Sequence, residues 1–126
     1  MQLKIGEKEY PITLGFAALD YLDKVYYLEF QNGAKLGQGV AYAVNYINDE
    51  NPLVIYHMIK AGTITERSKP SNEDIEAFIL ETGEKGNLDK LFKDFSDELK
   101  KQPLTKTKVI KLTKQIAELE KASKQG

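Results

Sequence analysis

The sequence has no cysteine and only one histidine among its 126 residues. Without cysteine it cannot form a disulfide or a thiolate metal site, a composition that fits a reducing compartment. Catalytic triads and most metal sites need a histidine with partners, but His57 lies in a strongly apolar segment with no acidic neighbour. We therefore expect a structural or surface role for His57, and we expect no cofactor, no metal and no enzymatic activity.

Long apolar runs are also missing. No run approaches the roughly 20 residues that span a bilayer, and the charged N-terminal segment is not typical of a signal peptide. Hydrophobic residues make up 41% and charged residues 29% of the chain, as in ordinary soluble globular proteins. At this length the chain can build one core but not two. We expect a single domain in a cytosolic protein that does not bind membranes.

The densest apolar material predicts a strand that runs directly into a helix. Apolar residues alternate with other residues over 9–14, which is typical of a half-buried strand, and then recur at spacings of three and four over 16–28, which is typical of a helix. Gly15 lies at the switch. Residues 2–5 predict a partner strand across a turn at Gly6. An isolated hairpin is marginal in water, so this one should pack on the helices.

Periodicity and capping residues predict five further helices. They are expected over residues 40–47, from the cap Asn51 through residue 61, from the cap Ser71 to Gly83, from the cap Asn87 to Pro103, and from Thr105 onward. A flexible connection is expected around Gly33, Gly37 and Gly39. The predicted fold class is α+β, as a mainly α-helical single domain with an N-terminal β-hairpin packed on the helices and an amphipathic C-terminal helix.

The C-terminal segment differs in charge from the rest of the chain. Residues 98–126 carry a net charge of +5, which leaves −6 on residues 1–97. Val109, Leu112, Ile116 and Leu119 follow at spacings of three, four and three, with lysines around them. The stripe is too short for an independent coiled coil but suits docking on a partner. We therefore expect a hairpin plus helical domain at 1–102 and a basic, mobile amphipathic helix at 103–126.

The lysines leave a second interpretation open, in which a small regulatory protein binds nucleic acid through the basic C-terminal helix. No arginine follows Arg67 and no aromatic residue follows Phe95. The C-terminal helix therefore offers neither bidentate base contacts nor stacking, which makes nucleic acid the weaker alternative.

Acidic pairs do not indicate catalysis. Asp20 and Asp23 lie three residues apart beside Lys24 on the first predicted helix, where we expect a solvated face rather than two carboxylates across a cleft.

Aromatic and apolar residues outside the expected core are candidates for protein contacts. They belong to the end of the first helix, the nearly all-apolar third helix and the C-terminal stripe. The candidate interaction residues are Tyr26, Tyr27, Phe30, Leu53, Tyr56, Ile59, Val109, Leu112, Ile116 and Leu119.

Four stretches in this order carry a family resemblance: Lys8-Glu-Tyr-Pro-Ile-Thr-Leu-Gly-Phe16, Lys69-Pro-Ser-Asn-Glu-Asp-Ile-Glu-Ala-Phe78, Asp89-Lys-Leu-Phe-Lys-Asp-Phe-Ser-Asp-Glu-Leu99 and Pro103-Leu-Thr-Lys106. Over residues 2–108 the chain resembles the tail assembly chaperones of long-tailed (siphovirus-type) bacteriophages or prophages, particularly those of Gram-positive bacteria.

The resemblance implies a non-enzymatic protein in the host cell cytoplasm. Such a protein would bind and solubilise the tape-measure protein and aid polymerisation of the tail tube. A longer, frameshifted form would recruit the tail-tube protein. We also expect a homo-oligomer, with the third helix and the aromatic region contacting either a second copy or the tape-measure protein.

Overall fold

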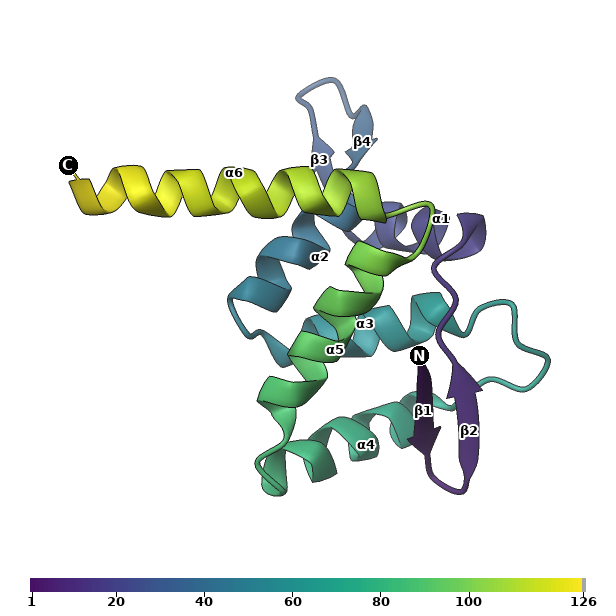
Figure 1. Ribbon diagram of the computed structural model, residues 1–126. Helices are drawn as coiled ribbons and strands as arrows, with labels where there is room; N and C mark the ends of the chain where they lie inside the picture. Colours follow the sequence, from purple (N-terminus) through teal and green to yellow (C-terminus); the bar gives the residue numbers. More distant parts are fainter. Residues whose placement is uncertain (126) are drawn as a thin grey trace.

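The computed structural model describes residues 1–125, with side chains through Ser123. The described part is mainly helical, with two separate two-stranded hairpins (Figure 1). The elements in chain order are β1 (Gln2–Ile5), β2 (Lys8–Pro11), α1 (Phe16–Val25), β3 (Tyr27–Glu29), β4 (Lys35–Gly37), α2 (Gly39–Asn48), α3 (Pro52–Gly62), α4 (Asn72–Glu84), α5 (Leu88–Lys101) and α6 (Lys106–Gln125). The predicted α+β class is confirmed.

The first hairpin packs on the helical body as expected. β1 and β2 pair antiparallel with Leu3 opposite Tyr10, and both of these side chains are buried together with Ile5. β1 contacts α4. The second strand is shorter than predicted because it ends at Pro11, but the following apolar residues Ile12 and Leu14 remain buried.

Helix α3 lies at the centre of the fold. It contacts α1, α2, α4 and α5, and Ile55, Met58 and Ile59 are completely buried. A helix that is apolar around most of its circumference requires such neighbours on several sides. At its C-terminal end, a Cβ on Gly62 would come within 2.5 Å of Ile12 Cγ2, so a larger residue there would push the helix away from the segment that follows β2.

Two of the three predicted helix caps are present. The Asn51 side chain accepts a hydrogen bond from the Leu53 amide, and Ser71 Oγ accepts one from the Asp74 amide at 3.0 Å. Both bonds satisfy an otherwise free amide at a helix start. Asn87 precedes α5 as predicted, but its side chain makes no capping bond. The Leu91 amide donates instead to the Asn87 carbonyl, as in any helix start.

A second hairpin replaces the flexible connection predicted after the first helix. Helix α1 ends at Val25, not at Leu28, and the chain then forms β3 and β4 around a tight turn. Gly33 in this turn has φ +86°, which glycine adopts without strain. The turn residues close an antiparallel pair rather than an open loop, and the flexibility of the connection stays a prediction.

The other two glycines of this region serve close packing. A Cβ on Gly39 would lie 2.6 Å from Leu22 Cβ, so the start of α2 can approach α1 only without a side chain. A Cβ on Gly37 would lie 2.5 Å from Asp23 Cγ. Asp23 in turn accepts a hydrogen bond from the Gly39 amide at 2.8 Å. Asp23 is exposed, as its sequence context predicted, and its carboxylate also caps the start of α2.

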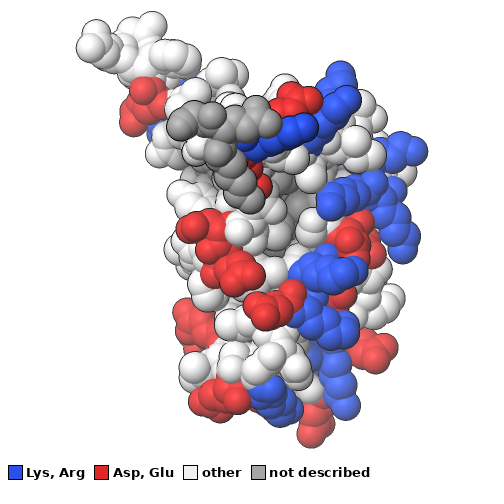
Figure 2. Space-filling model, turned by 60° about the vertical axis from the view of Figure 1, so that its left-hand side comes forward, with Lys and Arg blue, Asp and Glu red and all other residues white. Residues whose placement is uncertain are grey.

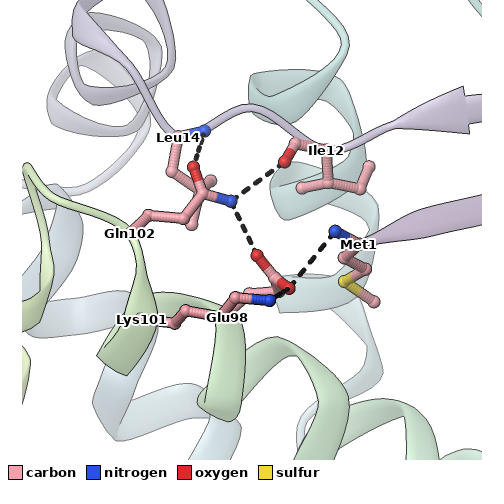
Figure 3. A network of polar contacts seen from close by, with 6 residues as sticks. All are labelled: Met1, Ile12, Leu14, Glu98, Lys101 and Gln102. Carbon is pink, nitrogen blue, oxygen red and sulfur yellow. Dashed lines mark hydrogen bonds and ion pairs between the residues drawn. The ribbon is translucent and has the colours of Figure 1, made fainter.

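A polar joint connects the segment after β2 to the end of α5 (Figure 3). The Gln102 side chain accepts from the Leu14 amide at 2.8 Å and donates to the Ile12 carbonyl at 3.0 Å. It also donates to Glu98, whose other oxygen lies 3.2 Å from the amino group of Met1. Residues nearly ninety positions apart in the chain are thereby held together.

The C-terminal part of helix α6 extends beyond the other helices (Figure 1). Its first half packs against α2 and α5, with Val109 buried and Leu112 and Ile116 half-buried. Leu119 belongs to the same stripe but is 70% exposed. The predicted amphipathic C-terminal helix is present. Its treatment as a separate, mobile segment from residue 103 stays a prediction, and any part of it at residue 126 lies outside the described residues.

Candidate protein-interaction surfaces

The structure divides the predicted interaction residues into three groups. Ile59 and Val109 are at most 1% exposed, so in this fold they stabilise the core and offer no surface to a partner. The half-buried members are Tyr26, Tyr56, Leu112 and Ile116. The exposed members are Tyr27, Phe30, Leu53 and Leu119. Eight predicted residues are therefore half-buried or exposed. The sequence interpretation missed several other exposed apolar side chains, including Leu28, Leu36 and Leu80.

The hairpin surface, defined here as Leu28, Phe30 and Leu36, was predicted only in part. Phe30 was a candidate interaction residue, but the two leucines were not. Leu28 and Leu36 are directly opposite in the antiparallel register, and Phe30 follows two residues after Leu28, so all three share one face. Each is between 44% and 52% exposed. The Asn32-Gly33 turn between two short apolar runs was the signal that could have predicted it.

An aromatic cluster lies where α1, α2 and α3 meet. Tyr26 makes a tilted contact with Tyr46 at 5.4 Å between ring centroids and an edge contact with Tyr42. Burial, with neighbouring Tyr46 and Tyr21, raises the pKa of Tyr26 to about 12. Its hydroxyl therefore stays protonated at neutral pH. These rings provide rigid, partly exposed contact area of the kind enriched in protein interfaces.

His57 belongs to this aromatic cluster. Its Nδ1 and the Tyr21 hydroxyl are hydrogen-bonded at 3.0 Å, and the Tyr56 ring packs edge-on against it. Burial, with a smaller contribution from the charge of Lys60, lowers the pKa of His57. The imidazole is therefore neutral at pH 7, with Nδ1 able to accept the hydroxyl proton. Its sequence context predicted a structural or surface role, and His57 is half-buried and hydrogen-bonded within the cluster.

An open apolar groove runs between α3 and α4. Its volume is about 520 Å³, and it is lined by Pro52, Leu53, Tyr56, His57, Glu76, Ile79 and Leu80. Leu53 is 59% and Leu80 is 66% exposed. Single exposed leucines are normal, but two on facing helices that line one hollow form a contiguous apolar patch. Leu80 and Ile79 were assigned to no surface from the sequence, because the weak periodicity of α4 does not separate its faces.

The charged surface is mixed rather than uniformly basic. Figure 2 shows Lys and Arg side chains along one side of the visible face, with acidic side chains between them. On α5, Lys90 pairs with Asp94 and Lys93 with Asp97 at 2.8 and 3.0 Å. Such exposed pairs add little stability, but they reduce the local positive charge.

Neither metal chemistry nor membrane insertion has support in the described residues. Within residues 1–125, no group of three or more histidine, cysteine or acidic side chains could hold a metal ion. In that same range no helix has the length and apolarity to cross a bilayer. The main surface features are exposed apolar patches on a small helical scaffold.

The chain belongs to the phage tail assembly chaperone family, since residues 2–114 match the family model described as phage tail assembly chaperone protein, TAC. The match includes both hairpins, all of α1 to α5 and the packed half of α6. No curated protein and no solved structure is significantly similar to the chain. Membership of this family indicates a role in assembly of phage tails through binding, with other tail proteins as partners.

Proposed function

We propose that this chaperone binds and solubilises the tape-measure protein and so aids polymerisation of the tail tube around it. The observation that carries the proposal is the amount of apolar surface that a family member of this size leaves exposed on two separate sites, the hairpin surface and the groove between α3 and α4. Apolar side chains on rigid elements can cover the apolar stripes of a helical client and prevent its aggregation.

The finer assignments belong to the same proposal. The protein would act in the host cell cytoplasm during infection by a long-tailed phage, or expression of a prophage, of a Gram-positive bacterium. The tail-tube protein would be recruited through a longer, frameshifted form. Self-association would be mediated by surfaces other than Ile59 and Val109, since these side chains are buried within one chain.

Co-expression with the tape-measure protein from the same genome tests the proposal. We expect the tape-measure protein to become soluble and to co-purify with the chaperone. Phe30→Ser combined with Leu36→Ser should reduce this solubilisation without unfolding the protein, because both side chains are about half exposed. Leu104→Ser, at an equally exposed site between α5 and α6, is the matched control. A tape-measure protein that stays insoluble while the chaperone elutes alone contradicts the proposal.

Nucleic-acid binding is the second candidate, favoured by the exposed lysines on α6. These are Lys106, Lys108, Lys111, Lys114 and Lys121. Contacts between lysine and phosphate would make affinity fall steeply with salt concentration. Absence of binding to duplex DNA or RNA at low salt removes this candidate.

A further inference from the structure

The groove between α3 and α4 has two chemically different ends. The helices run antiparallel, since Lys60 near the end of α3 donates to Asn72 at the start of α4 at 2.8 Å. At the opposite end, Pro52 lies in a second hollow together with Gly83, Glu84 and Leu88. The two hollows share Pro52, Ile79 and Leu80 and so form one continuous surface. This length suits an extended element rather than a compact molecule.

The apolar floor of the groove lies beside negative charge. Glu76 lines the first hollow and Glu84 the second, four residues before and after the exposed Leu80 on the same side of α4. Glu73 lies one turn before Glu76 and is exposed as well. Among the ion pairs of residues 1–125, α4 contributes only Glu81, which pairs with Lys85 at 2.8 Å. Glu76 and Glu84, beside Leu80, form none of these ion pairs, so their carboxylates can pair with a cationic partner.

This charge pattern decides which occupant fits. A second copy that presented the same face would bring the Glu76 and Glu84 carboxylates of both copies toward each other, and such like-charge contacts disfavour a symmetric pair. A partner with positive charges beside its apolar residues would instead complement the rim. Lys60 lies outside the residues that line the two hollows, with its amino group 5.6 Å from the centroid of the Tyr56 ring.

We propose that the groove between α3 and α4 binds an amphipathic helix of another protein whose apolar stripe is bordered by lysine or arginine. Leu53 and Leu80 contact the stripe from opposite walls, and Glu76 and Glu84 pair with the bordering cations. Docking of one helix between two others reproduces the packing that α3 already has inside the core. Such docking does not require that the tape-measure protein be the client.

The probe is a synthetic amphipathic helix of about five turns built from leucine, alanine and lysine, with a leucine, alanine and glutamate peptide of the same pattern as its counterpart. The full-length protein, labelled with ¹⁵N, is titrated with each peptide. We expect amide shifts at Leu53, Tyr56, His57 and Leu80 with the lysine peptide. The glutamate peptide should bind at least about tenfold more weakly.

Paired variants separate the groove from general attraction to an acidic body. Leu53→Ser with Leu80→Ser keeps every charge and should abolish saturable binding. Leu104→Ser with Ile110→Ser, at exposed apolar positions away from the groove, should leave it unchanged. Glu76→Gln with Glu84→Gln should weaken binding about tenfold and flatten its salt dependence. Glu7→Gln with Glu9→Gln, at exposed positions of the first hairpin, is the matched charge control.

Three results with the peptides would overturn the inference. They are unchanged lysine-peptide binding by the Leu53 and Leu80 double variant, shifts confined to residues outside α3 and α4, and equal binding of the two peptides. A second copy as the occupant would appear as concentration-dependent shifts at the groove without any peptide, and that result would also overturn it. Failure to solubilise the tape-measure protein, with peptide binding intact, would contradict the proposed function alone.

Discussion

The two hairpins have the same antiparallel pairing and opposite surroundings. β1 and β2 place Leu3, Ile5 and Tyr10 against the helices, where each is at most 8% exposed. β3 and β4 hold Leu28 and Leu36 in a comparable cross-strand pair, yet both leucines are about half exposed. Since a short hairpin gains little stability by itself, the first contributes its apolar side chains to folding. The second keeps them available for binding.

Truncation of one apolar side chain in each hairpin should give the largest difference. We expect Ile5→Ala to lower the free energy of unfolding by about 2–5 kcal/mol, since it leaves a cavity in a packed site. Leu36→Ala should cost less than about 0.5 kcal/mol, because half of its side chain already contacts water. Urea denaturation followed by circular dichroism measures both. Equal losses would mean that the second hairpin is structural too.

The second largest difference in stability is expected between two glutamine substitutions, one in the polar joint beside the first hairpin and one in the turn of the second hairpin. Gln102→Ala would leave the Leu14 amide and the Ile12 carbonyl without their partner, at a cost of about 1–3 kcal/mol. Gln31→Ala, in the exposed turn of the second hairpin, should be close to neutral. The midpoint of urea denaturation, compared at constant slope, is the measurement. A neutral Gln102→Ala would show that water replaces these bonds.

Asp23 connects the second hairpin region to α2, and its loss should have a smaller effect. We expect Asp23→Ala to cost about 1 kcal/mol, the usual magnitude for a lost helix cap, because Asp23 accepts from the Gly39 amide. Asp20→Ala removes only an exposed pair with Lys24 and should cost about 0.3–0.5 kcal/mol. Hydrogen exchange at the first turn of α2 should accelerate in the former variant and not in the latter.

Acid should affect the joint at the first hairpin through Glu98. Burial raises the pKa of Glu98, but the hydrogen bond from Gln102, the amino group of Met1 and Lys101 together outweigh burial and lower it. In the unfolded chain Glu98 therefore takes up a proton at a higher pH than in the folded protein. The stabilisation is present above the ordinary glutamate range, near pH 4.3, and is lost as the pH falls through the lower folded-state pKa.

Urea midpoints between pH 3 and 7 measure this loss. Glu98→Gln should flatten the decline in stability below about pH 5, and Glu29→Gln on β3 is the matched control at an exposed site. An identical pH profile for wild type and Glu98→Gln would mean that the carboxylate contributes nothing to the joint.

Much of the helical framework could be predicted because its signals are local. The apolar spacing of α2, α3 and α5 and the caps Asn51 and Ser71 depend on residues within one or two turns. The second hairpin could not be separated from a loop in this way, since three-residue strands carry too few positions to show alternation. Asn87 resembled a cap but makes no side-chain bond, because several backbone conformations suit an asparagine.

The candidate sites depended more strongly on contacts between distant residues. Apolarity alone placed Leu53 and Ile59 on the same list, although one is exposed and the other completely buried. Leu80 was missed because only the position of α3 beside α4 makes it the wall of a groove. Likewise, Asp23 became a cap only when α2 approached α1 at Gly39.

The sequence by itself determined a small helical protein with an N-terminal hairpin and a family pattern along most of its length, since composition, periodicity and capping act over short distances. Only the tertiary structure decided which apolar residues are core and which are surface. Burial is a property of neighbours far apart in the chain, and a side chain of the same type stabilises the fold in one place and offers a binding surface in another.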